Sequence, residues 1–384
     1  MPRMFIFLTA FTLIYCGMHL AAAEWLIRHF QIPFLRPGGI RLVFAALAIL
    51  FMASEWLVRE YPCPATRFLI TGTFIWMGVI FLWLSYAAVG TLAELAAMFI
   101  YGADIRHFLA WPVLTLAAVS SAYALFSGYH TPRIHKIEIP VKGLAQNLDG
   151  FKIVQISDIH LSVTVGPASI KRMVHQIEKT KPDLILLTGD IIDPGAYRLK
   201  ECADMLASMN PPFGKFAVLG NHEYYLGLDK AIPFLSEAGF VLLRQTLAEL
   251  PNGIQLIGVD DLKASHVPDA ALENLFSKAD PRKLSIYMTH QPLRLRLPEK
   301  FNIAITLAGH THGGQIFPFN LVTKLFYTRS VGKYPLGAGI LYVNPGTFHW
   351  GPPMRFFVPE EITVLILRPA ESHEKSLADS GSAE

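Results

Sequence analysis

Five short clusters in the sequence carry side chains that could do chemistry, and each cluster follows an apolar run. They are Asp158-Ile159-His160, Gly189-Asp190-Ile191-Ile192-Asp193, Gly220-Asn221-His222-Glu223, Thr289-His290 and Gly309-His310-Thr311-His312. Of the nine histidines after His135, five lie in these clusters. Carboxylate, amide oxygen and imidazole suit Mn²⁺, Fe or Zn²⁺ better than Ca²⁺ or a cysteine-based structural zinc site.

The clusters offer more ligands than one metal ion can use. Seven ligands, one of them a carboxylate shared by both metal ions, make a two-metal site. Such a site can bind both the attacking and the leaving oxygen of a phosphoryl transfer. A water held between two cations loses its proton more readily, so a bridging hydroxide is the expected nucleophile. Gly189, Gly220 and Gly309 would allow tight turns or a close approach of the backbone beside the metals.

The elements that must position these clusters are short apolar strands. The expected strands are 134–139, 152–157, 184–188, 216–219, 254–259, 284–289, 303–307, 341–343 and 362–367. Residues 170–179 have helical periodicity between two of them. Short apolar strands that alternate with helices predict buried sheets covered by helices, with ligands bound at the carboxyl ends of the strands.

The N-terminal third has a different composition. Residues 1–130 hold 12 charged side chains, whereas the other 254 residues hold 51. Four apolar stretches, each about the length needed to cross a bilayer, lie in this third: residues 4–23, 39–58, 68–93 and 107–132. The third apolar stretch could continue through residues 95–103 as a long or a broken helix. We therefore expect an all-α transmembrane region of about four helices at 1–130, an α/β domain at 131–369 and a disordered tail at 370–384.

Two features of the spans leave alternatives open. Arg3, the apolar run after it and three alanines before Glu24 also resemble a cleavable signal peptide, although the run is longer than usual for one. For orientation, six basic residues fall on the side of the N-terminus and the α/β domain and four on the other. They are Arg3, Arg59, Arg67, Arg133, Lys136 and Lys142 against Arg28, Arg36, Arg41 and Arg106. The positive-inside rule then favours a cytoplasmic α/β domain.

Bulk composition excludes several classes of protein. The chain is 52% hydrophobic, which argues against disorder, and its net charge of +3 gives no reason to expect nucleic-acid binding. Three cysteines cannot form a disulfide framework.

The ordered motif set resembles the calcineurin-like metallophosphoesterase superfamily. All five motifs occur in its order, D-x-H, G-D-x-x-D, G-N-H-[D/E], H and G-H-x-H, between residues 158 and 312. Within the superfamily, SDIHLS at 157–162 and GHTHGGQ at 309–315 resemble bacterial membrane-associated phosphoesterases of the YaeI/YkuE type. The resemblance implies a four-layer α-β-β-α sandwich over about residues 134–368. It does not explain the four apolar spans, although some relatives carry N-terminal membrane segments. The spans and the resemblance together predict a multi-pass protein of the bacterial inner membrane.

The resemblance also implies a role for each motif residue. Asp158, His160 and His312 would bind one divalent metal, Asn221, His290 and His310 the other, and Asp190 would bridge them. His222 would protonate the leaving oxygen or stabilise developing charge, and Asp193 would orient it. Glu223 would support the metal ligands without binding a metal itself. Manganese is the first expectation for the metals, with iron or zinc as alternatives.

Three functions are compatible with parts of this pattern. The first is a membrane-anchored enzyme that hydrolyses phosphodiester or pyrophosphate bonds, on a phosphate ester that could be lipid-linked, such as UDP-2,3-diacylglucosamine. The second is a non-catalytic membrane receptor or scaffold, which would predict loss of His222 or of metal ligands. The third is a transporter, suggested by Glu55 and Glu94 near apolar runs. The complete motif set favours the enzyme.

Some residues fit no motif. Asp260 and Asp261 follow a strand without a known role, and His349 is expected to be structural. The apolar stretch 317–335 could be an exposed lip at the site or ordinary core.

Overall fold

The N-terminal part of the chain is four long helices. The computed structural model describes residues 2–30 and 36–370. The helices are α1 (Pro2–His29), α2 (Pro37–Glu60), α3 (Pro64–Tyr101) and α4 (Arg106–Gly128), each long and apolar enough to cross a membrane. The predicted continuation of the third stretch is confirmed, because α3 is one helix of 38 residues that ends at Gly102 in a left-handed backbone conformation.

Two pairs of polar side chains form hydrogen bonds inside the helical bundle. His29 Nε2 lies 2.5 Å from Glu94 Oε1, and the indole of Trp76 donates to His19 Nε2 at 2.9 Å. Around them pack apolar side chains of all four helices, such as Trp25, Phe44 and Val113. Burial of polar groups in an apolar bundle costs free energy unless they are paired, and these two pairs lower that cost for the groups that form them.

The α/β part contains two six-stranded sheets. The first has the order β1-β12-β2-β3-β4-β5, and the second β10-β11-β9-β8-β7-β6. The strands are β1 (Arg133–Val141), β2 (Lys152–Ile156), β3 (Leu184–Thr188), β4 (Lys215–Val218), β5 (Val241–Leu242), β6 (Thr246–Glu249), β7 (Gln255–Gly258), β8 (Ser285–Met288), β9 (Ile305–Ala308), β10 (Gly332–Leu336), β11 (Gly339–Val343) and β12 (Glu361–Pro369). In each sheet the central strands run parallel, β2-β3-β4 and β7-β8-β9.

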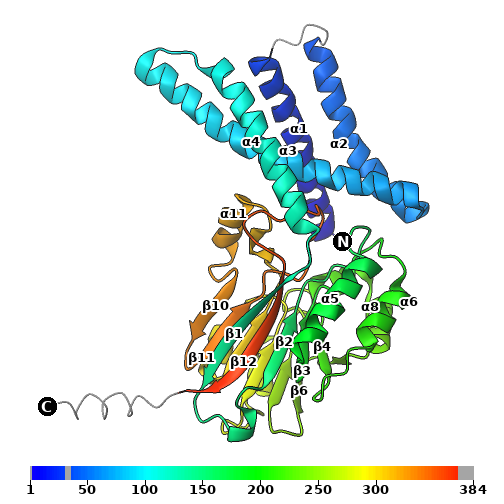
Figure 1. The fold of residues 1–384 in the computed structure, drawn as a ribbon, viewed down its shortest axis with the longest axis vertical. Coiled ribbons are helices and arrows are strands. Elements are labelled where there is room, and N and C mark those ends of the chain that lie inside the picture. The colour runs from blue at the N-terminus through cyan, green and yellow to red at the C-terminus, as the bar shows by residue number, and fades with distance from the viewer. Residues whose placement is uncertain (1, 31–35, 371–384) are drawn as a thin grey trace, which may run out of the picture. The chain divides into compact units, whose positions relative to one another are not determined.

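Helices cover the outer faces of the two sheets. Helices α5 (Pro167–Thr180), α6 (Leu199–Ala207) and α8 (Leu228–Glu237) pack on β2, β3 and β4 (Figure 1). Helices α9 (Asp269–Phe276) and α10 (Arg296–Lys300) pack on β7 and β8. Between the sheets lies a second apolar core to which both contribute, for example Leu186 and Met288. The predicted four-layer α-β-β-α arrangement is confirmed.

The remaining elements connect these layers. They are the 3₁₀ turns at Gln146–Leu148 and His312–Gly314, the short helix α7 (Asn221–Leu226) and α11 (Phe319–Phe326).

Two short segments from the C-terminal half belong to the helical unit. That unit comprises the described residues up to 130 together with 315–319 and 350–357. Ile316, Met354 and Phe356 form one apolar cluster with Leu82 of α3 and Ala124 of α4. The described remainder from 131 to 370 forms the α/β unit. The tail predicted at 370–384 lies outside the described residues except for Ala370.

Candidate active site

The five motif clusters follow the carboxyl ends of five strands. Asp158 comes shortly after β2, Asp190 after β3, Asn221 after β4, His290 after β8 and His310 after β9. Parallel strands deliver their carboxyl ends to one edge of a sheet, so side chains from both sheets meet there. The residues named from the sequence are brought together as three groups of atoms that could hold a metal ion. Two of the groups contain the expected metal ligands, and the third is His160, Asp193 and His222.

The first group contains Asp158, His160 and His312. His160 Nε2 lies 3.1 Å from His312 Nε2, and His312 Nε2 lies 3.5 Å from Asp158 Oδ1. All three residues are buried. Two imidazole nitrogens and a carboxylate oxygen that face one point form a donor set suited to a divalent transition-metal ion.

The second group contains Asp190, His290 and His310. Asn221 directly follows Gly220, whose backbone closely approaches the carboxylate of Asp190. His290 Nε2 lies 3.0 Å from Asp190 Oδ2 and 3.1 Å from His310 Nδ1. Among the described residues, the buried Oδ1 of Asn221 finds no hydrogen-bond partner. A buried amide oxygen without a donor is costly unless something else occupies its lone pairs, and a cation would do so.

One oxygen of Asp190 faces both groups. Its Oδ2 lies 3.0 Å from His290 Nε2 and 3.9 Å from His160 Nε2. Burial alone would raise the pKa of Asp190, but His290 and His222 beside it hold the pKa well below its usual value. Burial, followed by the adjacent His290, lowers the pKa of His310 to about 3, so this imidazole is neutral as a metal ligand must be. The site therefore favours positive charge around Asp190, which fits two cations that share this carboxylate.

Asp193 contacts two histidines. Its Oδ1 lies 2.6 Å from His222 Nδ1 and 3.0 Å from His160 Nδ1. These are hydrogen-bond distances, so Asp193 holds both rings by Nδ1 and turns each Nε2 away from itself. Burial lowers the pKa of His222, but Asp190 and Asp193 outweigh burial and raise it to about 9. A protonated His222 next to the two metal-ligating groups can donate a proton there.

Glu223 ties two active-site loops together. Its buried carboxylate accepts hydrogen bonds from four backbone N–H groups: those of Gly220, Asp190, Ile191 and Ile192, at 2.8, 3.0, 2.7 and 3.2 Å. The loop after β3 is thus fixed to the loop after β4, so Glu223 supports the position of Asp190 through the backbone rather than facing the metal-ligating groups.

The backbone at the site is held in uncommon conformations. Five of the metal-ligating residues have a left-handed backbone: Asp158 (φ 53°), His160 (φ 47°), Asp190 (φ 55°), His310 (φ 72°) and His312 (φ 48°). Each such residue costs on the order of 1 kcal/mol, and such strain concentrates at functional sites. At Gly309 an added Cβ would collide with Ser157 and Asp158, and at Gly220 it would collide with Asp190. The close approach predicted for these two glycines is therefore present.

Several residues beside His310 were not found from the sequence. The ring of Tyr327 packs edge-on against His310 with centroids 5.5 Å apart, and its hydroxyl donates to Gln291 at 2.8 Å. Gln291 in turn donates to Asp261 at 2.7 Å, and Lys263 Nζ lies 3.4 Å from the Tyr327 hydroxyl. These contacts place the phenol of Tyr327 next to the second metal-ligating group and the exposed ammonium group of Lys263 beside that phenol. Only Gln291, which directly follows His290, adjoins a motif in the sequence.

Other singled-out residues have structural partners. Asp260 accepts hydrogen bonds from Tyr224 and Arg244, both at 2.9 Å. His349 is buried between Glu360 and Thr164, at 3.1 Å from each.

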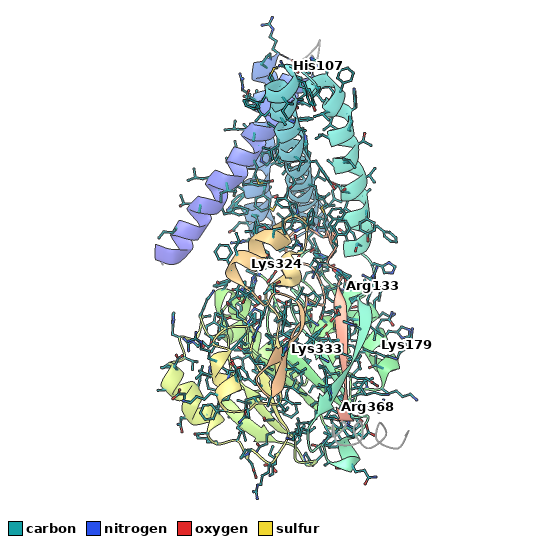
Figure 2. All side chains as sticks on the ribbon, turned by 90° about the vertical axis from the view of Figure 1, so that its left-hand side faces the viewer. His107, Arg133, Lys179, Lys324, Lys333 and Arg368 are labelled. Carbon is teal, nitrogen blue, oxygen red and sulfur yellow. The ribbon has the colours of Figure 1, made fainter. Side chains whose placement is uncertain are left out.

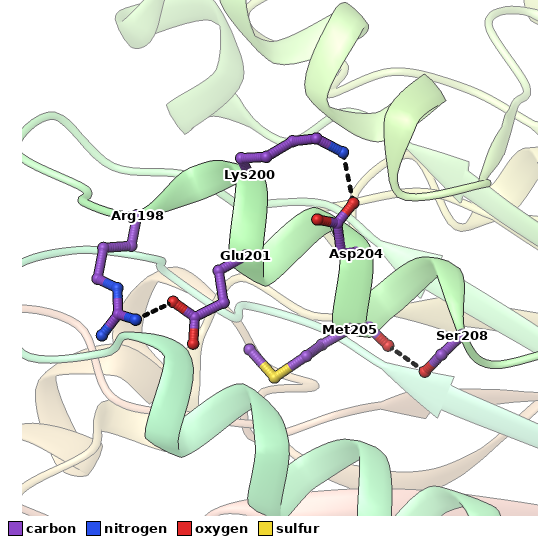
Figure 3. A pocket seen from close by; sticks show the side chains of 6 residues that line it. All are labelled: Arg198, Lys200, Glu201, Asp204, Met205 and Ser208. Atoms are coloured by element: carbon purple, nitrogen blue, oxygen red, sulfur yellow. Dashed lines mark hydrogen bonds and ion pairs between the residues drawn. The ribbon is translucent and has the colours of Figure 1, made fainter.

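A separate hollow of about 620 Å³ lies on α6 (Figure 3). It is lined by Arg198, Lys200, Glu201, Asp204, Met205 and Ser208, and two ion pairs, Arg198–Glu201 and Lys200–Asp204, lie in it. None of the motif residues lines it, and its charges already neutralise one another. The chemistry therefore belongs to the strand-end site.

Comparisons with known proteins give the family. Residues 151–314 match the family model of calcineurin-like phosphoesterases. A metallophosphoesterase of Aquifex aeolicus is 33% identical over 259 residues, which are 66% of this chain and 98% of that protein. The chain belongs to the calcineurin-like metallophosphoesterases. This is a family of metal-dependent phosphoester hydrolases, as the sequence predicted.

Two further relatives of this metallophosphoesterase match it over about two thirds of its length. The metallophosphoesterase YkuE of Bacillus subtilis is 37% identical, over 68% of this chain and 97% of that protein. A Danio rerio protein called "Transmembrane protein with metallophosphoesterase domain" is 32% identical over 67% of this chain. The matched region covers 62% of that relative's length.

Proposed function

We propose that this metallophosphoesterase is a multi-pass membrane enzyme that hydrolyses phosphodiester or pyrophosphate bonds with two divalent metal ions. The observation that carries the proposal is the meeting of two metal-ligating groups at Asp190 Oδ2, with His222 beside them. Asp158, His160 and His312 would hold one ion, and Asn221, His290 and His310 the other, with Asp190 shared. Manganese is the first candidate, and iron and zinc are alternatives.

Bound cations would neutralise the phosphoryl oxygens and lower the pKa of the attacking water. The chain itself supplies proton transfer and orientation. His222 Nε2 lies 3.8 Å from Asp190 Oδ2, so its proton points to the metal-ligating groups where the leaving oxygen departs. Asp193 holds that ring through Nδ1 and keeps it protonated, which suits a general acid. Lys263 and Tyr327 can contact the remaining part of the substrate.

The four apolar helices motivate the membrane part of the proposal. They would anchor the enzyme in the bacterial inner membrane with the α/β unit in the cytoplasm. An enzyme tethered at a bilayer meets membrane-embedded substrates at a raised effective concentration. A lipid-linked phosphodiester or pyrophosphate, of which UDP-2,3-diacylglucosamine is one example, is therefore the preferred substrate class.

Hydrolysis of bis(p-nitrophenyl) phosphate by the purified full chain in detergent tests this function. We expect turnover with Mn²⁺, its loss with a chelator, and at least a 100-fold loss in Asn221→Ala and in His222→Ala. The His222→Ala protein should keep its bound metal, whereas Asn221→Ala should bind less. Two bound metal ions without turnover on a panel of diesters and pyrophosphates would favour the receptor alternative, and no bound metal would contradict the mechanism.

A further inference from the structure

Helix α11 presents apolar side chains to the outside. Of this helix, which the structure describes in full, only Thr323 is buried. Leu325 and Phe326 are 81% and 77% exposed, and Phe319, Leu321 and Val322 are exposed as well. The α11 part of the apolar stretch 317–335 is therefore an exposed surface and not core. Contiguous exposed apolar surface of this kind marks an interaction site.

A second exposed apolar pair, Phe317 and Phe357, belongs to the helical unit. The rings of Phe317 and Phe357 lie 5.8 Å apart, and Phe357 is 72% exposed. Phe357 also has a left-handed backbone with φ 64°, which is rare for a bulky side chain. The local fold thus holds this ring outward at a cost in free energy.

The segments that carry these side chains pack on the apolar helices. Phe319, the first residue of α11, packs edge-on against Phe81 of α3 with centroids 6.2 Å apart. Phe356, next to Phe357, packs on Tyr123 of α4 at 6.0 Å. Phe319 and Phe356 thus belong to the helical unit, whose helices are long and apolar enough to span a bilayer.

The charge of this region suits an anionic lipid surface. Residues 315–357 contain no aspartate or glutamate and four basic residues, of which Lys324 and Lys333 are exposed (Figure 2). An apolar face flanked by lysine and free of acidic residues is typical of helices that lie in the membrane interface.

The other end of α11 reaches the active site. Tyr327 follows its last residue and packs on His310. From Tyr327 a groove of about 520 Å³ is lined by Arg296, Arg329, Leu295 and Phe326, among others. Arg294 and Asp269 also line it, and they form an ion pair with each other at 2.9 Å. Arginines beside leucine and phenylalanine would suit an anionic head group that carries an apolar chain.

We propose that α11 forms a membrane-binding lip, defined by Leu321, Val322, Leu325 and Phe326, that inserts into the lipid interface beside the metal-ligating site. Amphiphilic phosphate esters then reach the site along the groove at Tyr327 without leaving the bilayer. This second step rests on the proposed function, whereas insertion of the lip does not.

Insertion is tested by fluorescence of the full chain in nanodiscs of phosphatidylcholine and phosphatidylglycerol. Leu325→Cys is labelled with an environment-sensitive dye after Cys16→Ser and Cys63→Ser. Cys202 is left in place because it is buried and burial raises the pKa of its thiol to about 11. Nitroxide-labelled acyl chains should quench Leu325→Cys several-fold more than Val241→Cys, an exposed apolar position on β5. Equal quenching at the two positions would overturn the proposal.

Substrate entry is tested with the pair Leu321→Ser/Leu325→Ser and the control Val241→Ser. Hydrolysis of hexadecyl p-nitrophenyl phosphate embedded in vesicles should fall about fivefold in the pair and stay unchanged in the control. Hydrolysis of soluble bis(p-nitrophenyl) phosphate should be unchanged in both. An equal fall on both substrates would refute entry through the lip. Absence of hydrolysis by the unmodified enzyme would instead count against the proposed function, while the quenching result would stand.

Discussion

A single oxygen of Asp193 sets the orientation of two imidazole rings at the candidate site. Because it lies within hydrogen-bond distance of Nδ1 of both His160 and His222, it couples a proposed metal ligand to the proposed general acid. Burial would raise the pKa of Asp193, but the two histidines lower it to about 2, so the carboxylate stays charged across the working pH range.

Asp193→Asn should lower turnover on bis(p-nitrophenyl) phosphate by about 10- to 100-fold. The amide keeps one acceptor but loses the charge that helps to raise the pKa of His222. The alkaline limb of the pH–rate profile should therefore move to lower pH, since His222 would lose its proton earlier. Metal content is measured on the same sample. Loss of bound metal would report an effect on His160, whereas lower turnover with full metal content would report an effect on His222. An unchanged pH profile would contradict this role.

Position 309 requires glycine because neighbouring side chains leave no room for a Cβ, and not because the backbone must be flexible there. A Cβ in Gly309→Ala would displace Asp158, so we expect loss of bound metal and about a 100-fold loss of turnover. Gly72→Ala in α3 is the matched control, because its Cβ would meet no neighbouring atom within 4 Å. If the two variants are equally active, the close approach at Gly309 does not matter for catalysis.

Among the elements, buried parallel strands were the most predictable. Strands such as 184–188 are covered on both faces, so they are continuous apolar runs that end at the polar motif residues. Strands β5, β6 and β10 were missed because β5 has two residues and the other two are partly exposed edge strands.

The supporting contacts of the site could not be predicted. The four donors of Glu223 come from two loops about 30 residues apart in sequence. Tyr327 reaches His310 only because α11 returns the chain to the site. Such contacts depend on tertiary packing and leave no pattern in the local sequence.

Lys215 joins three elements at the start of β4. Its buried Nζ donates to the carbonyl groups of Leu206 and Ala238 at 2.6 and 3.0 Å, which lie at the C-terminal ends of α6 and α8. Helix ends leave carbonyl groups without partners, and a lysine there satisfies them.

Lys215→Met should lower the free energy of unfolding by about 2 kcal/mol at pH 7. Burial lowers the pKa of Lys215 to about 8, below the value in the unfolded chain. Between pH 8 and about 10 the unfolded chain then binds more protons, so the wild type gains stability with rising pH and the difference should widen. Thermal melting of both proteins in detergent at pH 7 and 9.5 measures this. A constant difference would refute the pKa argument.

For the molecule as a whole, four spans would put both termini on one side of the membrane. If the α/β unit is cytoplasmic, a fluorescent protein fused after Glu384 should fluoresce, and alkaline phosphatase fused there should be inactive. A phosphatase fused after Asp104, between α3 and α4, should be active. The reverse pattern would place the enzyme on the outer side and exclude cytoplasmic lipid precursors as substrates.

The pairing of β1 with β12 has a consequence for how the protein is made. β1 lies five residues after α4 and pairs in parallel with β12 over nine residues, from Arg133 with Glu361 to Val141 with Pro369. At about 5–20 residues per second, a ribosome needs on the order of 10 to 50 seconds to synthesise the chain between these partners. The helices can insert into the bilayer during that time, while β1 remains an open edge. Completion of the first sheet therefore has to wait until β12 has been synthesised, and a nascent chain that stops before β12 would leave that edge available for wrong pairing.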